Sequence, residues 1–223
     1  MKNLLLTYVA GEDFIKREDF RAFLQSAHLA MPGVDKIVCH HHAYDIHQID
    51  WVEKEFGVEF MKCPTPHGKN VLLDRWGAYH HATSGIRLHK HVAIADARDI
   101  VFQDNPFKHE EARIEAEYKY LVVCSEGMKH RQSEWNLIDQ FKYQMPFGEY
   151  QSDFKDWDVF NAGFVMGTPA SISELSMLMW QGYVGRQGVS DQAVFNHLIN
   201  GRYGLVSSLI YHRPSHSQLC LTG

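Results

Sequence analysis

Short apolar runs alternate along the chain with longer segments in which apolar residues recur every three or four positions. The short runs are bounded by turn residues and predict buried strands, whereas the longer segments predict amphipathic helices. The clearest helix is expected over Glu18–Met31, because Phe20, Phe23 and Leu24 share one face of it with Ala27. This alternation is typical of an α/β fold, in which helices flank a mixed, mostly parallel central sheet.

The expected strands are Asn3–Val9, Lys36–His40, Val58–Lys62, His91–Ala95, Tyr118–Cys124, Val159–Met166 and Gly204–Ile210. Further helices are expected over Ser171–Gln181 and Ser190–Asn200, with Ser190 as the N-cap of the second. The segment Gln140–Trp157 follows neither period and mixes aromatic, Gly, Pro and acidic residues, which favours a loop over a site. No repeat or linker divides the chain, so we expect a single domain over residues 1–223.

The composition is that of a globular chain that can bury a sizeable core, since 45% of its 223 residues are hydrophobic and 22% are charged. A formal net charge of -5 disfavours bulk nucleic-acid binding. No apolar run approaches the ~20 residues that a transmembrane helix needs, and the N-terminus lacks the features of a signal peptide. The four cysteines form no CxxC pair, and we expect a cytoplasmic location.

The residues with the most chemical information follow the expected strand His91–Ala95. Asp96 and Asp99 are three positions apart with Arg98 between them, at a strand end where α/β proteins collect ligands. Two close carboxylates repel each other, and Mg²⁺ or Mn²⁺ relieves that repulsion through oxygen ligands. The spacing therefore predicts a divalent-metal site, with a simple turn or helix cap as the alternative for these residues taken alone.

Together with other segments, this motif resembles the GT-A class of nucleotide-sugar glycosyltransferases. That class carries a DxD or DxxD metal motif at the end of a central strand, and Ile100–Phe107 resembles the stretch that often follows it. Asn161–Gly163 resembles the N-A-G strand of the class, and Ser190–Asn196 resembles its S-D-Q-x-x-x-N helix start. The resemblance spans roughly residues 3 to 217, and it implies a single GT-A (Rossmann-like) domain.

The resemblance also implies a role for particular residues. The implied nucleotide-binding residues are Thr7, Tyr8, Val9, Arg75, Asp96, Ala97 and Arg98. The implied sugar and acceptor residues are Asn161, Ala162, Gly163, Asp191 and Gln192. The implied ligands for Mn²⁺ or Mg²⁺ are Asp96 and Asp99, completed by His216 or alternatively by His212.

Two carboxylates are candidate catalytic residues. Asp191 begins the S-D-Q helix. Glu126 follows another expected strand, and its role is open between a catalytic base, an acceptor-positioning group and a solvated residue. The expected reaction is metal-dependent sugar transfer from a nucleoside diphosphate sugar, a UDP-sugar first, to a hydroxyl of a glycan or another acceptor. The N-A-G and S-D-Q elements favour retention over inversion.

Other classes fit the sequence less well. A non-catalytic nucleotide- or metal-binding module of the same fold is the first alternative. A nucleotidyltransferase is the second, but Val9–Asp13 is acidic where such enzymes usually have a Gly-rich basic loop. The histidine clusters at 40–42 and 80–91 have no zinc-site spacing, and no G-x-S-x-G, GxGxxG or P-loop motif is present.

Overall fold

The computed structural model describes residues 1–64, 71–85, 89–108, 121–144, 153–183, 188–200, 209–214 and 220–222. Their strands are β1 (Lys2–Val9), β2 (Asp35–His40), β3 (Glu59–Lys62), β4 (His89–Ala95), β5 (Ile100–Phe102), β6 (Leu121–Lys129), β7 (Asp158–Gly167), β8 (Leu209–Pro214) and β9 (Cys220–Thr222). Their longer helices are α1 (Glu18–Ala30), α2 (Ile46–Phe56), α3 (Val71–Ser84), α5 (Glu134–Gln144), α6 (Pro169–Tyr183) and α7 (Asp191–Asn200). Short 3₁₀ turns are η1 (Phe14–Lys16), η2 (His130–Gln132) and η4 (Phe154–Asp156).

The central sheet has seven strands in the order β3-β2-β1-β4-β7-β6-β8. Strand β7 runs antiparallel to both of its neighbours, and the other neighbouring pairs are parallel. A second, two-stranded sheet pairs β5 with β9. The mixed, mostly parallel sheet expected from the sequence is therefore confirmed.

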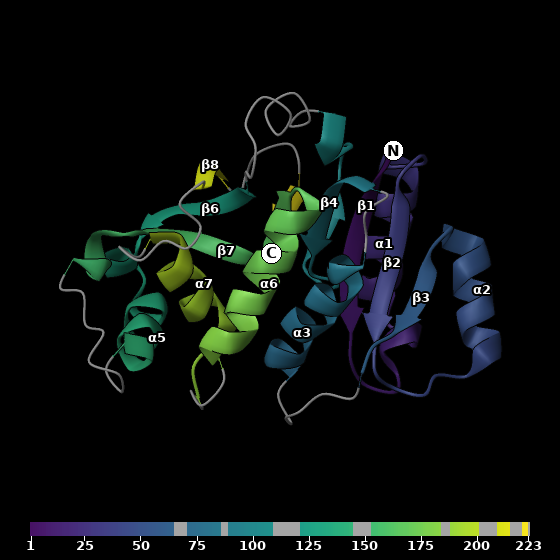
Figure 1. The fold of residues 1–223 in the computed structure, drawn as a ribbon, viewed down its shortest axis with the longest axis horizontal. Helices are drawn as coiled ribbons and strands as arrows, with labels where there is room; N and C mark the ends of the chain where they lie inside the picture. The colour runs from purple at the N-terminus through teal and green to yellow at the C-terminus, as the bar shows by residue number, and fades with distance from the viewer. Residues whose placement is uncertain are drawn as a thin grey trace.

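Helices cover both faces of the central sheet, and the side chains of β1 divide between the two cores. Leu4 and Leu6 point into a core built with α3, α6 and α7, whereas Leu5 and Val9 point into a core built with α1 and α2. Figure 1 shows α3 and α6 packed side by side over one face of the sheet. Because β1 is buried on both faces, its sequence is a nearly continuous apolar run rather than an alternating one.

Local sequence explains where several helices begin and end. The predicted apolar face of α1 is confirmed, with Phe20, Phe23 and Leu24 buried. Asp45 caps α2 by accepting a hydrogen bond from the amide of His47 at 2.8 Å. The predicted N-cap of α7 is also confirmed, because the Ala193 amide donates to Ser190 Oγ at 3.2 Å.

Three element predictions need correction. Gln140–Gln144 form the last part of α5 rather than a loop. Strand β6 continues to Lys129, so Glu126 lies within the strand rather than after it. Strand β8 begins at Leu209 and continues to Pro214, while 204–208 lie outside the described residues.

The prediction at α5 is wrong because this helix buries several polar side chains and exposes several apolar ones. Its buried positions include Asn136, Asp139 and Gln140, whereas Trp135 and Ile138 are exposed. An apolar stripe toward the core is therefore missing, and the sequence gives no normal amphipathic signal. Among the helices of the described segments, none combines the length and apolarity needed to cross a membrane.

Candidate active site

The carboxyl edge of the sheet gathers the residues that the motifs singled out. Strand β4 ends at Ala95, so Asp96 is the first residue beyond it. Strand β7 passes alongside in the opposite direction, and the Asp96 amide donates to the carbonyl of Gly163 at 2.8 Å. Since β6 is parallel to β4 through β7, Glu126 reaches the same edge.

Arg75 connects the DxxD segment to the S-D-Q helix. From α3 its guanidinium donates one hydrogen bond to Asp96 Oδ1 and another to Asp191 Oδ2, and it is itself buried. The indole of Trp76 also donates to Asp191 Oδ2, at 3.1 Å. Three predicted site residues from distant parts of the sequence therefore form one ionic cluster.

The charges of this cluster do not balance. Although burial opposes its charge, the carboxylates of Asp191 and Asp96 raise the pKa of the Arg75 guanidinium. Burial, together with the negative charges of Asp191 and Asp99, raises the pKa of the Asp96 carboxyl, and Arg75 only partly offsets this. One guanidinium between two carboxylates leaves an excess negative charge, which a cation would complement.

The N-A-G strand approaches Asp96 so closely that a side chain is excluded at its glycine. The amide of Gly163 donates to Asn161 Oδ1 at 2.7 Å. A Cβ at position 163 would lie 2.7 Å from Asn161 Oδ1 and 3.1 Å from Asp96 Oδ2. A side chain at position 163 would therefore force Asn161, on the same strand, and Asp96, at the end of β4, to move.

Two amides converge on one carboxylate at the other side of the site. Asn161 Nδ2 donates to Glu126 Oε1 at 3.3 Å, and Gln192 Nε2 donates to the same oxygen at 3.0 Å. Gln192 Nε2 also lies 3.0 Å from Asn136 Oδ1. The N-A-G strand, the S-D-Q helix and β6 thus meet in one polar network.

The predicted nucleotide residues on β1 have different surroundings. Thr7 is buried, and its hydroxyl donates to the Ala95 carbonyl at 2.7 Å, which ties β1 to the residue before Asp96. Val9 is buried in the core. Tyr8 forms a hydrogen bond with Nδ1 of His41, and burial, reinforced by the negative charge of Asp74, raises the pKa of its hydroxyl.

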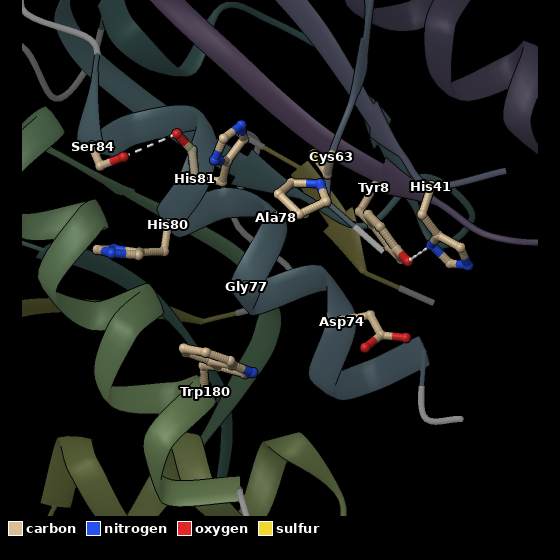
Figure 2. A pocket seen from close by; sticks show the side chains of 11 residues that line it. Tyr8, His41, Cys63, Asp74, Gly77, Ala78, His80, His81, Ser84 and Trp180 are labelled. Atoms are coloured by element: carbon tan, nitrogen blue, oxygen red, sulfur yellow. Dashed lines mark hydrogen bonds between the residues drawn. The ribbon is translucent and has the colours of Figure 1, made fainter. Parts of the chain in front are cut away.

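Tyr8 and His41 stand at one end of a cleft of about 320 Å³ that extends along α3. Figure 2 shows Asp74 near them, His80 and His81 farther along α3, and Trp180 on the neighbouring helix α6. Histidines from both clusters noted in the sequence line this cleft: His41 from the first, and His80 and His81 from the second.

The remaining predicted residues flank the ionic cluster. Ala97 and Ala162 are buried. Arg98 and Asp99 are exposed and lie 3.7 Å apart between Nη2 and Oδ2. Trp76 is a core residue with no exposed surface.

Oxygen ligands of the kind that Mg²⁺ and Mn²⁺ prefer are available at this edge. Arg75 holds Asp96 through Oδ1, and the side chain of Asp99 is 48% exposed. The described residues contain no group of three His, Cys, Asp or Glu side chains suited to a metal. His212 lies on β8 with its backbone opposite Val123, and His216 lies outside the described residues.

Sequence reasoning missed two residues of the network. Asn136 and Asp139 lie on the buried face of α5 and contact Gln192 and Ser190, respectively. Their segment carried no motif, and the only available signal was the unusual exchange of polar and apolar positions along α5.

No protein-family model matches the chain, and no curated protein matches it in sequence. Solved structures of LgtC are similar in fold. An active-site mutant of LgtC, glutamine to glutamate, superposes with a TM-score of 0.61 and 13% identity over 96% of this chain and 73% of LgtC. The galactosyltransferase LgtC in complex with donor and acceptor sugar analogues superposes with a TM-score of 0.57 and 13% identity. This superposition covers 88% of this chain and 70% of LgtC.

The similarity in fold extends over 96% of the chain, which includes the sheet and the helices described above. The chain has the GT-A fold, a single α/β domain built on a mixed, mostly parallel sheet.

Proposed function

We propose that this chain is a glycosyltransferase that moves a sugar from a nucleoside diphosphate sugar to an acceptor hydroxyl. The observation that carries the proposal is the meeting of Arg75, Asp96 and Asp191 at the carboxyl edge of a GT-A sheet. The LgtC complex with donor and acceptor sugar analogues supports it by fold. A UDP-sugar is the donor that we would test first.

The DxxD segment would serve the diphosphate half of the donor. Arg75 binds Asp96 through Oδ1, so among the described residues Oδ2 is the oxygen that we assign to a cation, and Asp99 is exposed beside it. When bound there, Mn²⁺ or Mg²⁺ would neutralise the negative charge of the departing nucleoside diphosphate. Arg75 would keep Asp96 in place and would lower the repulsion between the two buried carboxylates.

The sugar would lie between the N-A-G strand and the S-D-Q helix. Within the described part of the chain, the contacts from Arg75 and Trp76 to Asp191 fall on Oδ2, and we propose that Oδ1 accepts a sugar hydroxyl. The amides of Asn161 and Gln192 would bind further hydroxyls, since an amide offers both a donor and an acceptor.

The reaction exchanges one bond at the anomeric carbon for another. The bond to the diphosphate oxygen breaks, the acceptor oxygen bonds to the anomeric carbon, and the acceptor gives up its proton. Glu126 is our candidate for receiving that proton, because Asn161 and Gln192 hold its Oε1 and thereby orient Oε2. We propose retention at the anomeric carbon, a point that NMR of the product would decide.

The direct test is donor binding and turnover with UDP-, GDP- and dTDP-sugars in the presence of Mn²⁺ or Mg²⁺. We expect one donor to be hydrolysed slowly without an acceptor, and Asp96→Asn to abolish that turnover. Asp156→Asn is the matched control, because Asp156 is an exposed carboxylate paired with Arg131. Failure of every donor to bind would overturn the proposal, and binding without turnover on any acceptor would point to a non-catalytic module.

A further inference from the structure

Helix α5 presents polar side chains to the protein and apolar side chains to solvent. Asn136, Asp139 and Gln140 are at most 8% exposed, whereas Trp135 and Ile138 are 57% and 45% exposed. Buried polar groups are costly unless they are hydrogen-bonded. Asn136 and Asp139 have such hydrogen-bond partners, and most of these lie at the start of α7.

Among the described residues, Asp139 accepts hydrogen bonds from Ser190. The amide of Ser190 lies 3.2 Å from Asp139 Oδ2 and 3.4 Å from Oδ1, and the Ser190 hydroxyl also donates to Oδ2. Ser190 Oγ in turn accepts the Ala193 amide at 3.2 Å. Asp139 thus holds the residue that caps α7 and fixes where this helix begins.

Asn136, one turn earlier on α5, holds the other side of the same turn. Its Oδ1 accepts a hydrogen bond from Gln192 Nε2 at 3.0 Å, and its Nδ2 donates to Ser133 Oγ at 2.9 Å. Asp139 and Asn136 therefore hydrogen-bond to the residues at positions 190 and 192, respectively. Between these positions lies Asp191, whose carboxylate is bound by Arg75 and Trp76.

We propose that Asp139 is a positioning residue of the candidate active site. By orienting Ser190, it sets the first turn of α7 and so directs Asp191 and Gln192 toward the sugar. Asp139 itself contacts Ser190 rather than any reacting group. The catalytic consequence rests on the proposed function, but the order of the α7 first turn can be measured without it.

The chain offers graded variants for a test. Asp139→Ala removes both acceptor oxygens, Asp139→Asn keeps one of them, and Ser190→Ala removes the hydroxyl of the cap. Asp156→Asn changes an exposed carboxylate that is 2.6 Å from Arg131 and lies on η4, outside α5 and α7. It is the matched control.

The first readout is amide hydrogen exchange in the wild-type chain and the variants. We expect Asp139→Ala to accelerate exchange at Ala193 by about tenfold while the amides of β1 keep their rates. Asp139→Asn should restore part of the protection. Unchanged exchange at Ala193, or an equal acceleration throughout β1, would overturn the proposal, because the role would then be absent or merely structural.

The second readout is the kinetics of donor turnover. We expect Asp139→Ala to lower kcat by about 10- to 100-fold with little change in the donor KM, as small misplacements of a positioned group do. The double variant with Ser190→Ala should lose no more than the larger single loss. An unchanged kcat would overturn the proposal. A wild-type chain without turnover, but with the expected exchange pattern, would overturn the proposed function and leave the positioning of α7 standing.

Discussion

Arg75 and Asp191 form a buried ion pair across 116 residues of sequence. The same guanidinium binds Asp96, so a single side chain of α3 joins the end of β4 to the start of α7. Removing the Arg75 guanidinium would leave the carboxylates of Asp96 and Asp191 without this ion pair and poorly solvated. Arg75 is therefore central to stability as well as to the site.

We predict that Arg75→Met lowers the free energy of unfolding by about 3–5 kcal/mol, because it leaves buried charge uncompensated. Urea denaturation measures the change. Arg131→Met is the matched control, since Arg131 forms an exposed pair with Asp156, and such pairs contribute about 1 kcal/mol or less. Equal losses for the two variants would contradict a buried ionic cluster.

A second prediction concerns the close contact between β7 and the DxxD segment. Gly163→Ala places a methyl group 2.7 Å from Asn161 Oδ1 and 3.1 Å from Asp96 Oδ2. We expect a loss of about 1–3 kcal/mol in unfolding free energy, as for other overpacked sites. Gly33→Ala, where nothing lies within 4 Å of the added carbon, should stay within about 0.5 kcal/mol of wild type. A tolerated methyl group at position 163 would refute the contact.

A third prediction concerns the cation that the excess negative charge implies. We expect Asp96→Asn and Asp99→Asn each to weaken Mn²⁺ binding by about tenfold or more, since even residues that only orient metal ligands contribute 10- to 100-fold. Calorimetric titration with Mn²⁺ alone measures this, with Asp156→Asn as the control. Unaltered affinity in both variants would remove the DxxD segment from the metal site.

Much of the fold was predictable because parallel strands that are buried on both faces have nearly continuous apolar sequences. The break in polarity after Ala95 located Asp96 at the sheet edge, and the Ser190 cap located the start of α7. Such local signals are visible in sequence because each depends on neighbouring residues.

The rest depends on contacts between distant segments. Arg75 has no sequence neighbour that reveals its pairing with Asp191, and the polar inner face of α5 has meaning only opposite α7. The polarity of Glu126 interrupts an apolar run and so predicts the end of a strand, although β6 continues past it. Tertiary hydrogen bonds from Asn161 and Gln192 account for a carboxylate at that position.

A fourth prediction concerns the thiol at the cleft wall. Cys63 lines the cleft, and a hydrogen bond from the Cys39 thiol lowers its pKa, although burial opposes this. The same hydrogen bond, together with burial, raises the pKa of Cys39. Because the thiolate is the reactive form, we expect iodoacetamide at pH 7.5 to label Cys63 before Cys39 and Cys124.

Peptide mass mapping over time measures the labelling of each cysteine separately, so labelling of Cys220 does not affect the comparison. Cys63→Ser should remove the fast phase of labelling. Cys39, Cys63 and Cys124 are all buried, so the expected order depends on the cleft and on the lowered pKa of Cys63, and faster labelling of Cys124 would contradict it.

The last prediction concerns acid sensitivity. His130 is 1% exposed, and burial lowers the pKa of its imidazole. Between this lowered pKa and the ordinary value of about 6.5, the unfolded chain binds more protons than the folded one. Stability is therefore fully present above about pH 6.5 and falls as the pH decreases below it.

We expect the unfolding free energy of the wild type to decrease from pH 7 to pH 5.5, with His130 contributing at most about 1.4 kcal/mol for each pH unit. His130→Asn should flatten this decrease, even if it lowers stability at pH 7. His47→Asn is the control, since His47 is exposed on α2 and its replacement leaves the core intact. Urea titrations at each pH measure how steeply the unfolding free energy falls. An equally steep decrease in His130→Asn would assign the acid sensitivity to other groups. His40 and His41 are such groups, because burial also lowers their pKa values.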